Sequence, residues 1–185
     1  MRILFLGDII GLPGCNAVNT HLPKIIKKHQ IDFVIVNGEN CAENGMGITE
    51  DIANSLFKSG VNVITSGNHI WDQKETATHI EREDRLLRPY NSFYQAPGKG
   101  FKVYNLENNF KICVLNLMGN IFMKKSKNCF RSAKKFLEKN SLKNDYDFLV
   151  LDIHAETNIE KMSIGHFFDG KATLVIGTHT HVPTN

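Results

Sequence analysis

The sequence has few cysteines, and none of them lie close together. The 185-residue chain has four, with no C-x-x-C pair among them: Cys15, Cys41, Cys113 and Cys129. Regularly spaced cysteines are needed both in secreted domains cross-linked by disulfides and in zinc sites built from thiolates. We therefore expect free thiols and a cytoplasmic protein.

Long hydrophobic runs are also missing. The first apolar run covers residues 3–6 and is interrupted at Asp8. A signal-peptide core needs about 7–15 apolar residues, and a membrane-spanning helix needs about 20. The short run argues against both, and we expect no membrane partner.

The excess of positive charge is small. A net charge of +3 suits an anionic substrate but is low for a protein that coats nucleic acid. One basic stretch stands out, made of Lys124, Lys125, Lys127, Arg131, Lys134 and Lys135. Aromatic residues are sparse around it, so we interpret it as a solvated helix face and do not expect stable nucleic-acid binding.

Apolar runs alternate with segments of helical period. Strands are expected at residues 3–6, 33–36, 61–65, 101–106, 110–117, 148–153 and 173–176, and the fourth and fifth of these predict a hairpin around Glu107-Asn108-Asn109. Helices are expected around residues 18–26, where Pro23 predicts a kink or a break, between Thr49 and Gly60, and at residues 76–83, 132–139 and 160–168. The pattern predicts one α/β domain over residues 1–185 with much parallel pairing.

Polar side chains that can bind metals stand where the apolar runs end. They follow five different runs and comprise Asp8, Glu39, Asn40, Asn68, His69, His154, His179 and His181. Glycine precedes most of these clusters and allows tight turns. Because ligands bind at the carboxyl ends of strands in α/β sheets, we expect these residues to meet at one edge of one sheet.

The donor set points to a metal centre. His179 and His181 are the strongest pair, since two imidazoles one residue apart at a strand end face the same small volume. Burying two carboxylates and several imidazoles together without a cation is costly. Seven donors are available without His69, whereas one tetrahedral site needs about four, so we expect more than one ion. Nitrogen and oxygen donors favour Fe, Mn or Zn.

The order of these motifs resembles the calcineurin-like metallophosphoesterases, and more closely the bacterial YmdB-type phosphodiesterases. The resemblance is carried by Gly7-Asp8-Ile9-Ile10-Gly11, Asn37-Gly38-Glu39-Asn40, Gly67-Asn68-His69-Ile70-Trp71, Asn116-Leu117-Met118-Gly119, His154-Ala155-Glu156 and residues 177–183. It runs in order over essentially the whole chain. It implies a β-sandwich with mixed sheets flanked by helices, and hydrolysis of small phosphodiesters, notably 2′,3′-cyclic nucleotides.

The resemblance also implies roles for individual residues. One metal would be held by Asp8, Glu39, Asn40 and His181, and the other by Glu39 as a bridge, Asn68, His154 and His179. Iron is the expected metal, with manganese as the alternative. The hypothesis is attack by metal-activated hydroxide, with His69 as a catalytic histidine that protonates the leaving ribose oxygen.

Three features depart from the family pattern. The first motif lacks the histidine of Asp-x-His, and Asn40 is expected to replace that donor. Cys15 stands where the branch commonly has a basic residue. Family members continue past the Gly177–His181 motif, whereas this chain stops at Asn185, so we expect an incomplete second sheet without its C-terminal strands.

Alternative interpretations of the function stay open. The leading one is a truncated, catalytically impaired homologue that keeps only the fold and the metal site. A nucleotide-binding module is disfavoured, because Gly7, Gly11 and Gly14 do not form Gly-x-Gly-x-x-Gly and Asp8 would repel a pyrophosphate. The sequence leaves a homo-oligomer open. Several residues are assigned structural roles only, namely Trp71, Asp72, Cys41, His21, His29, His79 and His166.

Overall fold

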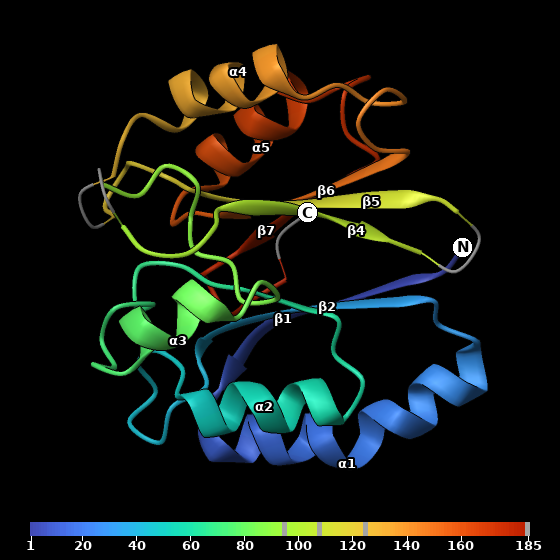
Figure 1. Cartoon of the computed structure of the whole chain (residues 1–185). Helices are drawn as coiled ribbons and strands as arrows, with labels where there is room; N and C mark the ends of the chain where they lie inside the picture. The colour runs from blue at the N-terminus through green and yellow to red at the C-terminus, as the bar shows by residue number, and fades with distance from the viewer. Residues whose placement is uncertain (94–95, 107–108, 124–125, 184–185) are drawn as a thin grey trace.

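The protein is built from two sheets with helices on their outer faces (Figure 1). The computed structural model describes residues 1–93, 96–106, 109–123 and 126–183. Glu107 and Asn108 of the expected hairpin turn, and Lys124 and Lys125 of the basic stretch, lie outside the described residues. The architecture is a mixed α/β fold, as the alternating pattern predicted.

The first sheet is entirely parallel and has the order β1-β2-β3. Its strands are β1 (Ile3–Ile10), β2 (Phe33–Asn40) and β3 (Val63–Thr65). The accompanying helices are α1 (Gly11–His29), α2 (Glu50–Lys58) and the short α3 (Thr76–Arg82). Thr49 caps α2 as predicted, with its side chain accepting a hydrogen bond from the Ile52 amide. Pro23 lies inside α1 without ending it, so the predicted break does not occur.

The second sheet is mixed and has the order β4-β5-β6-β7. Its strands are β4 (Phe101–Asn105), β5 (Lys111–Met118), β6 (Phe148–His154) and β7 (Leu174–Thr178). β4 and β5 are antiparallel, as the hairpin prediction requires, and β5, β6 and β7 are parallel. The outer face of this sheet carries α4 (Cys129–Lys139) and α5 (Asn158–Phe167) (Figure 1).

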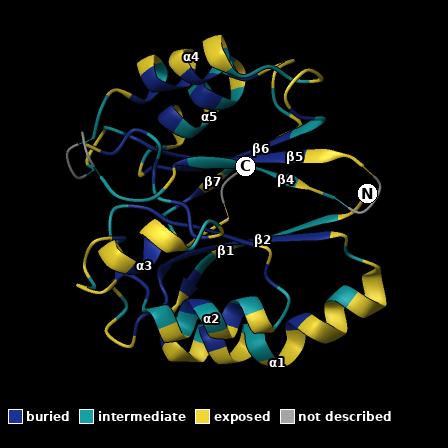
Figure 2. Ribbon diagram, in the orientation of Figure 1, coloured by how far each residue is buried: buried dark blue, intermediate teal, exposed yellow. Residues whose placement is uncertain are grey.

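The two sheets share an apolar layer. Phe33, Ile35 and Val63 of the first sheet pack in one cluster with Ile112 and Val150 of the second. The middle strands are buried along almost their whole length, while the helices expose their outward faces (Figure 2). This shared layer fixes how the carboxyl ends of the two sheets stand relative to each other.

The structure corrects the expectation that all polar strand ends share one sheet. Asp8, Glu39, Asn40 and Asn68 belong to the first sheet or the loop after it, whereas His154 ends β6 of the second sheet and His179 directly follows β7. The strands β1 and β2 are also longer than predicted and include Asp8 and Asn40. Asp8 pairs with Asn37 of β2, but the register shifts on either side of Asp8, and such irregularities re-aim side chains.

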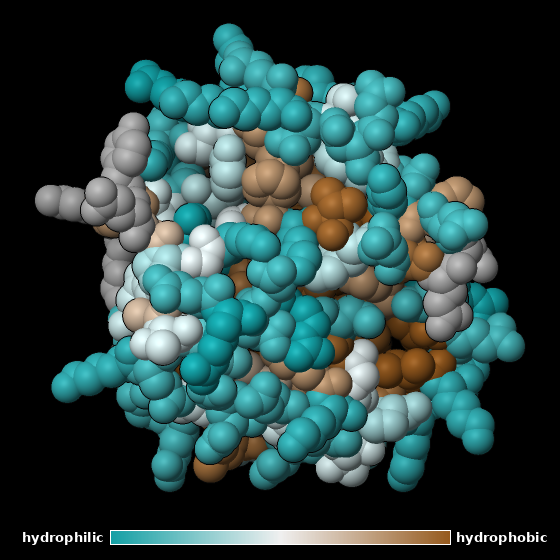
Figure 3. Space-filling view, viewed as in Figure 1, coloured by the Kyte–Doolittle hydropathy of each residue, from teal (hydrophilic) through white to brown (hydrophobic). Residues whose placement is uncertain are grey.

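None of the helices in the described part of the chain is both long and apolar enough to span a bilayer. On the face drawn in Figure 3, hydrophilic side chains predominate and apolar ones reach the surface in small separate areas. The four cysteines are unpaired and buried.

Candidate metal centre

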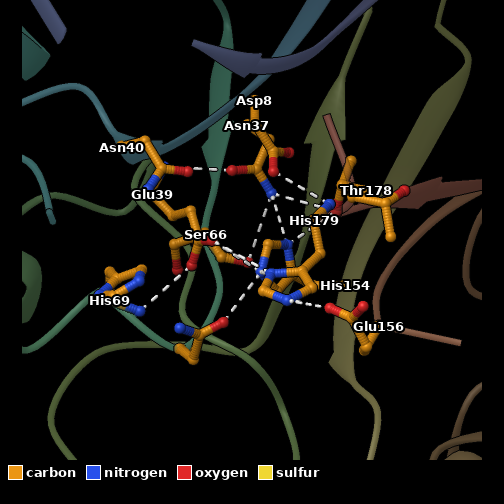
Figure 4. Close-up of polar contacts among 12 residues, drawn as sticks. Asp8, Asn37, Glu39, Asn40, Ser66, His69, His154, Glu156, Thr178 and His179 are labelled. Carbon is orange, nitrogen blue, oxygen red and sulfur yellow. Dashed lines mark hydrogen bonds and ion pairs between the residues drawn. The ribbon is translucent and has the colours of Figure 1, made fainter. Parts of the chain in front are cut away.

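Glu39, His154 and His179 form the centre of the site and point toward one another between the two sheets (Figure 4). Glu39 Oε1 lies 2.8 Å from His154 Nε2 and 3.7 Å from His179 Nδ1. The two imidazoles approach with His179 Nδ1 3.1 Å from His154 Nε2. Glu39 and His154 are buried, at 1% and 0% exposure, so water does not screen this cluster.

A second group stands beside the first and consists of Asp8, Asn40 and His181. His181 Nε2 lies 3.0 Å from Asp8 Oδ2 and 3.3 Å from Asn40 Oδ1. The Asn40 amide nitrogen donates to the Gly45 carbonyl over 2.8 Å, which turns Oδ1 toward His181. Asp8 Oδ1 is buried with no hydrogen-bond partner among the described residues. An unpartnered buried carboxylate oxygen is unusual and fits a cation ligand.

The loop after β3 brings Asn68 and His69 to the same centre. Asn68 Oδ1 lies 3.2 Å from His154 Nε2, and the His69 amide donates to Glu39 Oε2 over 3.1 Å. This close approach requires glycine at position 67, because a Cβ there would lie 2.2 Å from the His154 ring and 2.3 Å from Glu39 Oε2. The imidazole of His69 pairs with Asp72, with 2.6 Å between Nδ1 and Oδ2.

A polar layer beneath the cluster fixes the orientation of His154. Thr178 Oγ1 donates to Asp152 Oδ1 over 2.6 Å, and it therefore accepts the hydrogen bond from His154 Nδ1 at 2.9 Å. Thr65 and Asn37 donate to the other oxygen of Asp152, at 2.6 and 3.0 Å. With its proton on Nδ1, His154 presents the lone pair of Nε2 to Glu39.

Glu156 fixes the orientation of His179 in the same way. Its Oε2 lies 2.9 Å from His179 Nε2, so that nitrogen donates and Nδ1 faces the cluster with its lone pair. Two imidazole lone pairs thus point at each other across 3.1 Å, with a carboxylate and an amide oxygen beside them. One proton cannot satisfy all of these acceptors, whereas a cation can, so the residues present fit a metal centre.

The pKa shifts show how these groups depend on one another. Burial works to raise the pKa of the Glu39 carboxyl, but the adjacent imidazoles of His154 and His179, when they carry protons in place of a cation, outweigh it and hold this pKa well below its usual range. The Glu39 carboxylate in turn raises the pKa of His179 against the effect of its burial. Burial raises the pKa of the Asp152 carboxyl to about 6, although its donors favour the charged form. Glu39 is therefore an anion that needs positive charge beside it.

The site opens to solvent on the side of the last strand. A cleft of about 360 Å³ is lined by Asp8, His179, Thr180 and His181, together with Gly7, Ile10, Gly177, Thr178, Val182 and Pro183. Small ligands bind in concave sites of this kind. A molecule in this cleft would touch the two terminal histidines directly.

Eight residues singled out from the sequence thus converge, because each of them contacts another of the set. The sequence reasoning missed the residues that orient them: Asn37, Asp72, Asp152, Glu156 and Thr178. Asp72 was assigned to capping and packing, yet it pairs with His69. The signal for Asp152 was present, since an acidic residue inside the apolar run 148–153 needs buried partners.

Comparisons with known proteins agree with this geometry. A family model described as YmdB-like protein matches residues 4–185. A Bacillus subtilis (strain 168) protein named 2′,3′-cyclic-nucleotide 2′-phosphodiesterase is 42% identical over 184 residues, which cover 100% of this chain and 68% of that protein. The chain spans about two thirds of the length of the relatives it matches.

Two solved structures have the same fold over the whole of this chain. A hypothetical protein from Thermus thermophilus superimposes with a TM-score of 0.91 at 40% identity, and the match covers 69% of that chain. A Mycoplasma pneumoniae protein described as a novel phosphatase superimposes with a TM-score of 0.90 at 36% identity, and the match covers 66% of it.

Proposed function

Because the chain belongs to the YmdB-like protein family, we propose that it is a metal-dependent phosphoric diester hydrolase. The name of the Bacillus subtilis relative supports 2′,3′-cyclic nucleotides as substrates. The proposal includes a single metallophosphoesterase-type β-sandwich domain, for which the apolar layer between the two sheets is the support.

The observation that carries the proposal is the convergence of lone pairs from His154 Nε2 and His179 Nδ1 beside Glu39. In this proposal one metal ion is held by Asp8, Glu39, Asn40 and His181, and a second by Glu39, Asn68, His154 and His179. The contacts fall into these two groups, and a bridging role for Glu39 joins them. The donors suit iron and also manganese.

The chemistry that bound cations supply at such a site is activation of water and neutralisation of charge on phosphoryl oxygens. The chain's own residues supply the proton. Asp72 fixes the His69 ring through Nδ1, so Nε2 is the nitrogen that exchanges a proton with the leaving ribose oxygen. The His69 amide meanwhile holds Glu39 Oε2 and ties the position of the ring to the centre.

One experiment tests this assignment. The purified chain is analysed for metal and assayed on a 2′,3′-cyclic nucleotide with and without added Mn²⁺, beside His69→Ala. We expect hydrolysis that depends on metal, and a roughly 10²–10⁴-fold slower turnover in the variant with its metal content unchanged. Full activity of His69→Ala would refute the acid role, and activity in the absence of all metal would refute the centre.

The same assay addresses the second candidate function, a homologue that retains only fold and metal site. Bound metal without hydrolysis of any small phosphodiester would favour it. We further infer a cytoplasmic location, which the four free thiols support. The proposed partner is a small phosphodiester substrate, and the proposal leaves a homo-oligomer open.

A further inference from the structure

The turn that carries His179 and His181 has an unfavourable backbone conformation. His179 and His181 both have positive φ angles, 97° and 54°, in a region that residues other than glycine rarely adopt. Such conformations persist only where surrounding contacts impose them. One such contact is the His179 amide, which donates to Asp8 Oδ2 over 2.9 Å.

A second contact comes from a different element and lies between the two histidines. Lys161, in the first turns of α5, reaches across β7 and donates from Nζ to Thr180 Oγ1 over 2.9 Å. Its path crosses β7 at Gly177, where a Cβ would lie 2.6 Å from Lys161 Cδ. Gly177 thus leaves the space that the lysine stem uses to reach Thr180.

We propose that Lys161, held over Gly177 and bonded to Thr180, is a positioning residue that keeps His179 and His181 in their metal-facing conformation. The inference rests on the proposed metal centre, because it concerns residues assigned there as ligands. It assigns Lys161 no contact with the substrate. Without the lysine, the turn loses one of the contacts that offset its strained backbone and relaxes away from Asp8.

A simpler role for Lys161 would be to balance the negative charge of nearby carboxylates, and this role can be distinguished from positioning. Partial burial of this ammonium lowers the pKa of Lys161, and the carboxylates that act against this effect are Asp8, Glu156 and Asp152. If Lys161 only balanced those carboxylates, its removal would strengthen the binding of a cation, because a nearby positive charge would disappear. If Lys161 positions the turn, its removal weakens cation binding. The two roles predict opposite signs.

The test measures Mn²⁺ affinity of the metal-free chain by titration for Lys161→Met, Thr180→Val and Gly177→Ala. We expect about tenfold weaker binding in each, as for other partners that orient metal ligands. The double variant Lys161→Met/Thr180→Val should lose no more than either single variant, because both remove the same contact. Lys134→Met, an exposed lysine of α4, is the matched control and should bind as the unaltered chain does.

A second measurement needs no metal. Hydrogen exchange of the His179 amide, which donates to Asp8, should be about tenfold faster in Lys161→Met and Thr180→Val, while the amides of β6 exchange unchanged. Tighter Mn²⁺ binding by Lys161→Met with unaltered binding by Thr180→Val would overturn the inference, as would unchanged exchange at His179. If the unaltered chain binds no Mn²⁺, the proposed function fails, and the exchange rates alone decide the role of Lys161.

Discussion

Asp8 and His179 stand 171 positions apart in the sequence, yet the His179 amide donates to Asp8 Oδ2 over 2.9 Å. The first residue comes from β1 of the parallel sheet, and the second follows β7 of the mixed sheet. This bond spans the two sheets at the site. It also leaves the other oxygen of Asp8 buried and without a hydrogen-bond partner among the described residues.

Asp8→Asn should therefore have opposite effects with and without metal. In the metal-free chain the change replaces a carboxylate whose Oδ1 is buried without a partner by a neutral amide whose oxygen can still accept from the His179 amide, and we expect the free energy of unfolding to rise by about 1–3 kcal/mol. With Mn²⁺ present the variant should gain less thermal stability than the unaltered chain, because a charged ligand is lost. Thermal unfolding with and without Mn²⁺ measures both. A lower unfolding midpoint in the metal-free variant would contradict this account of Asp8.

Gly67→Ala should eliminate the centre. The new Cβ would lie about 2.2–2.3 Å from the His154 ring and Glu39 Oε2, and neither buried side chain has room to retreat. We expect loss of bound metal and a destabilisation of about 1–3 kcal/mol from overpacking. The matched control is Gly165→Ala in α5, since a Cβ at Gly165 meets nothing within 4 Å. Metal analysis of the two variants separates them, and equal metal content in both would show that the close approach is not needed.

Glu156→Gln should weaken metal binding without unfolding the chain. The carboxylate holds His179 Nε2 at 2.9 Å, and loss of such a partner typically reduces metal affinity by about 10–100-fold. Glu138→Gln makes the same chemical change at an exposed position of α4 and should have no effect. Competition with a coloured chelator measures both affinities. Indistinguishable values would mean that Glu156 does not orient His179.

Asp72→Asn should slow turnover while metal content stays constant. Asp72 holds the His69 ring by a 2.6 Å contact to Nδ1, and the amide would hold it less well. We expect about a 10–100-fold loss of kcat, smaller than the loss in His69→Ala. The double variant should be no slower than His69→Ala alone, since Asp72 acts through that ring. Additive losses would give Asp72 a role of its own.

Apolar periodicity and capping residues were enough to locate the strands and helices from the sequence. Each predicted strand and helix overlaps an observed one, because apolar periodicity and caps such as Thr49 act over a few residues. The predicted ends of the strands were less accurate than their positions. β1 and β2 run on through Asp8 and Asn40, since pairing with a neighbouring strand extends a strand beyond its apolar run.

The sequence by itself predicted which residues supply the donor atoms of the proposed metal centre, because donor chemistry belongs to the side chain: Asp8, Glu39, Asn40, Asn68, His154, His179 and His181. Only the tertiary structure decided that they come from two sheets, since strand order cannot be read from local periodicity. It also decided which nitrogen of His154 and of His179 faces inward, because Thr178 and Glu156 reach those rings only in the folded chain. Hydrogen bonds between side chains depend on distances of a few ångströms, and only packing of the whole chain sets those distances.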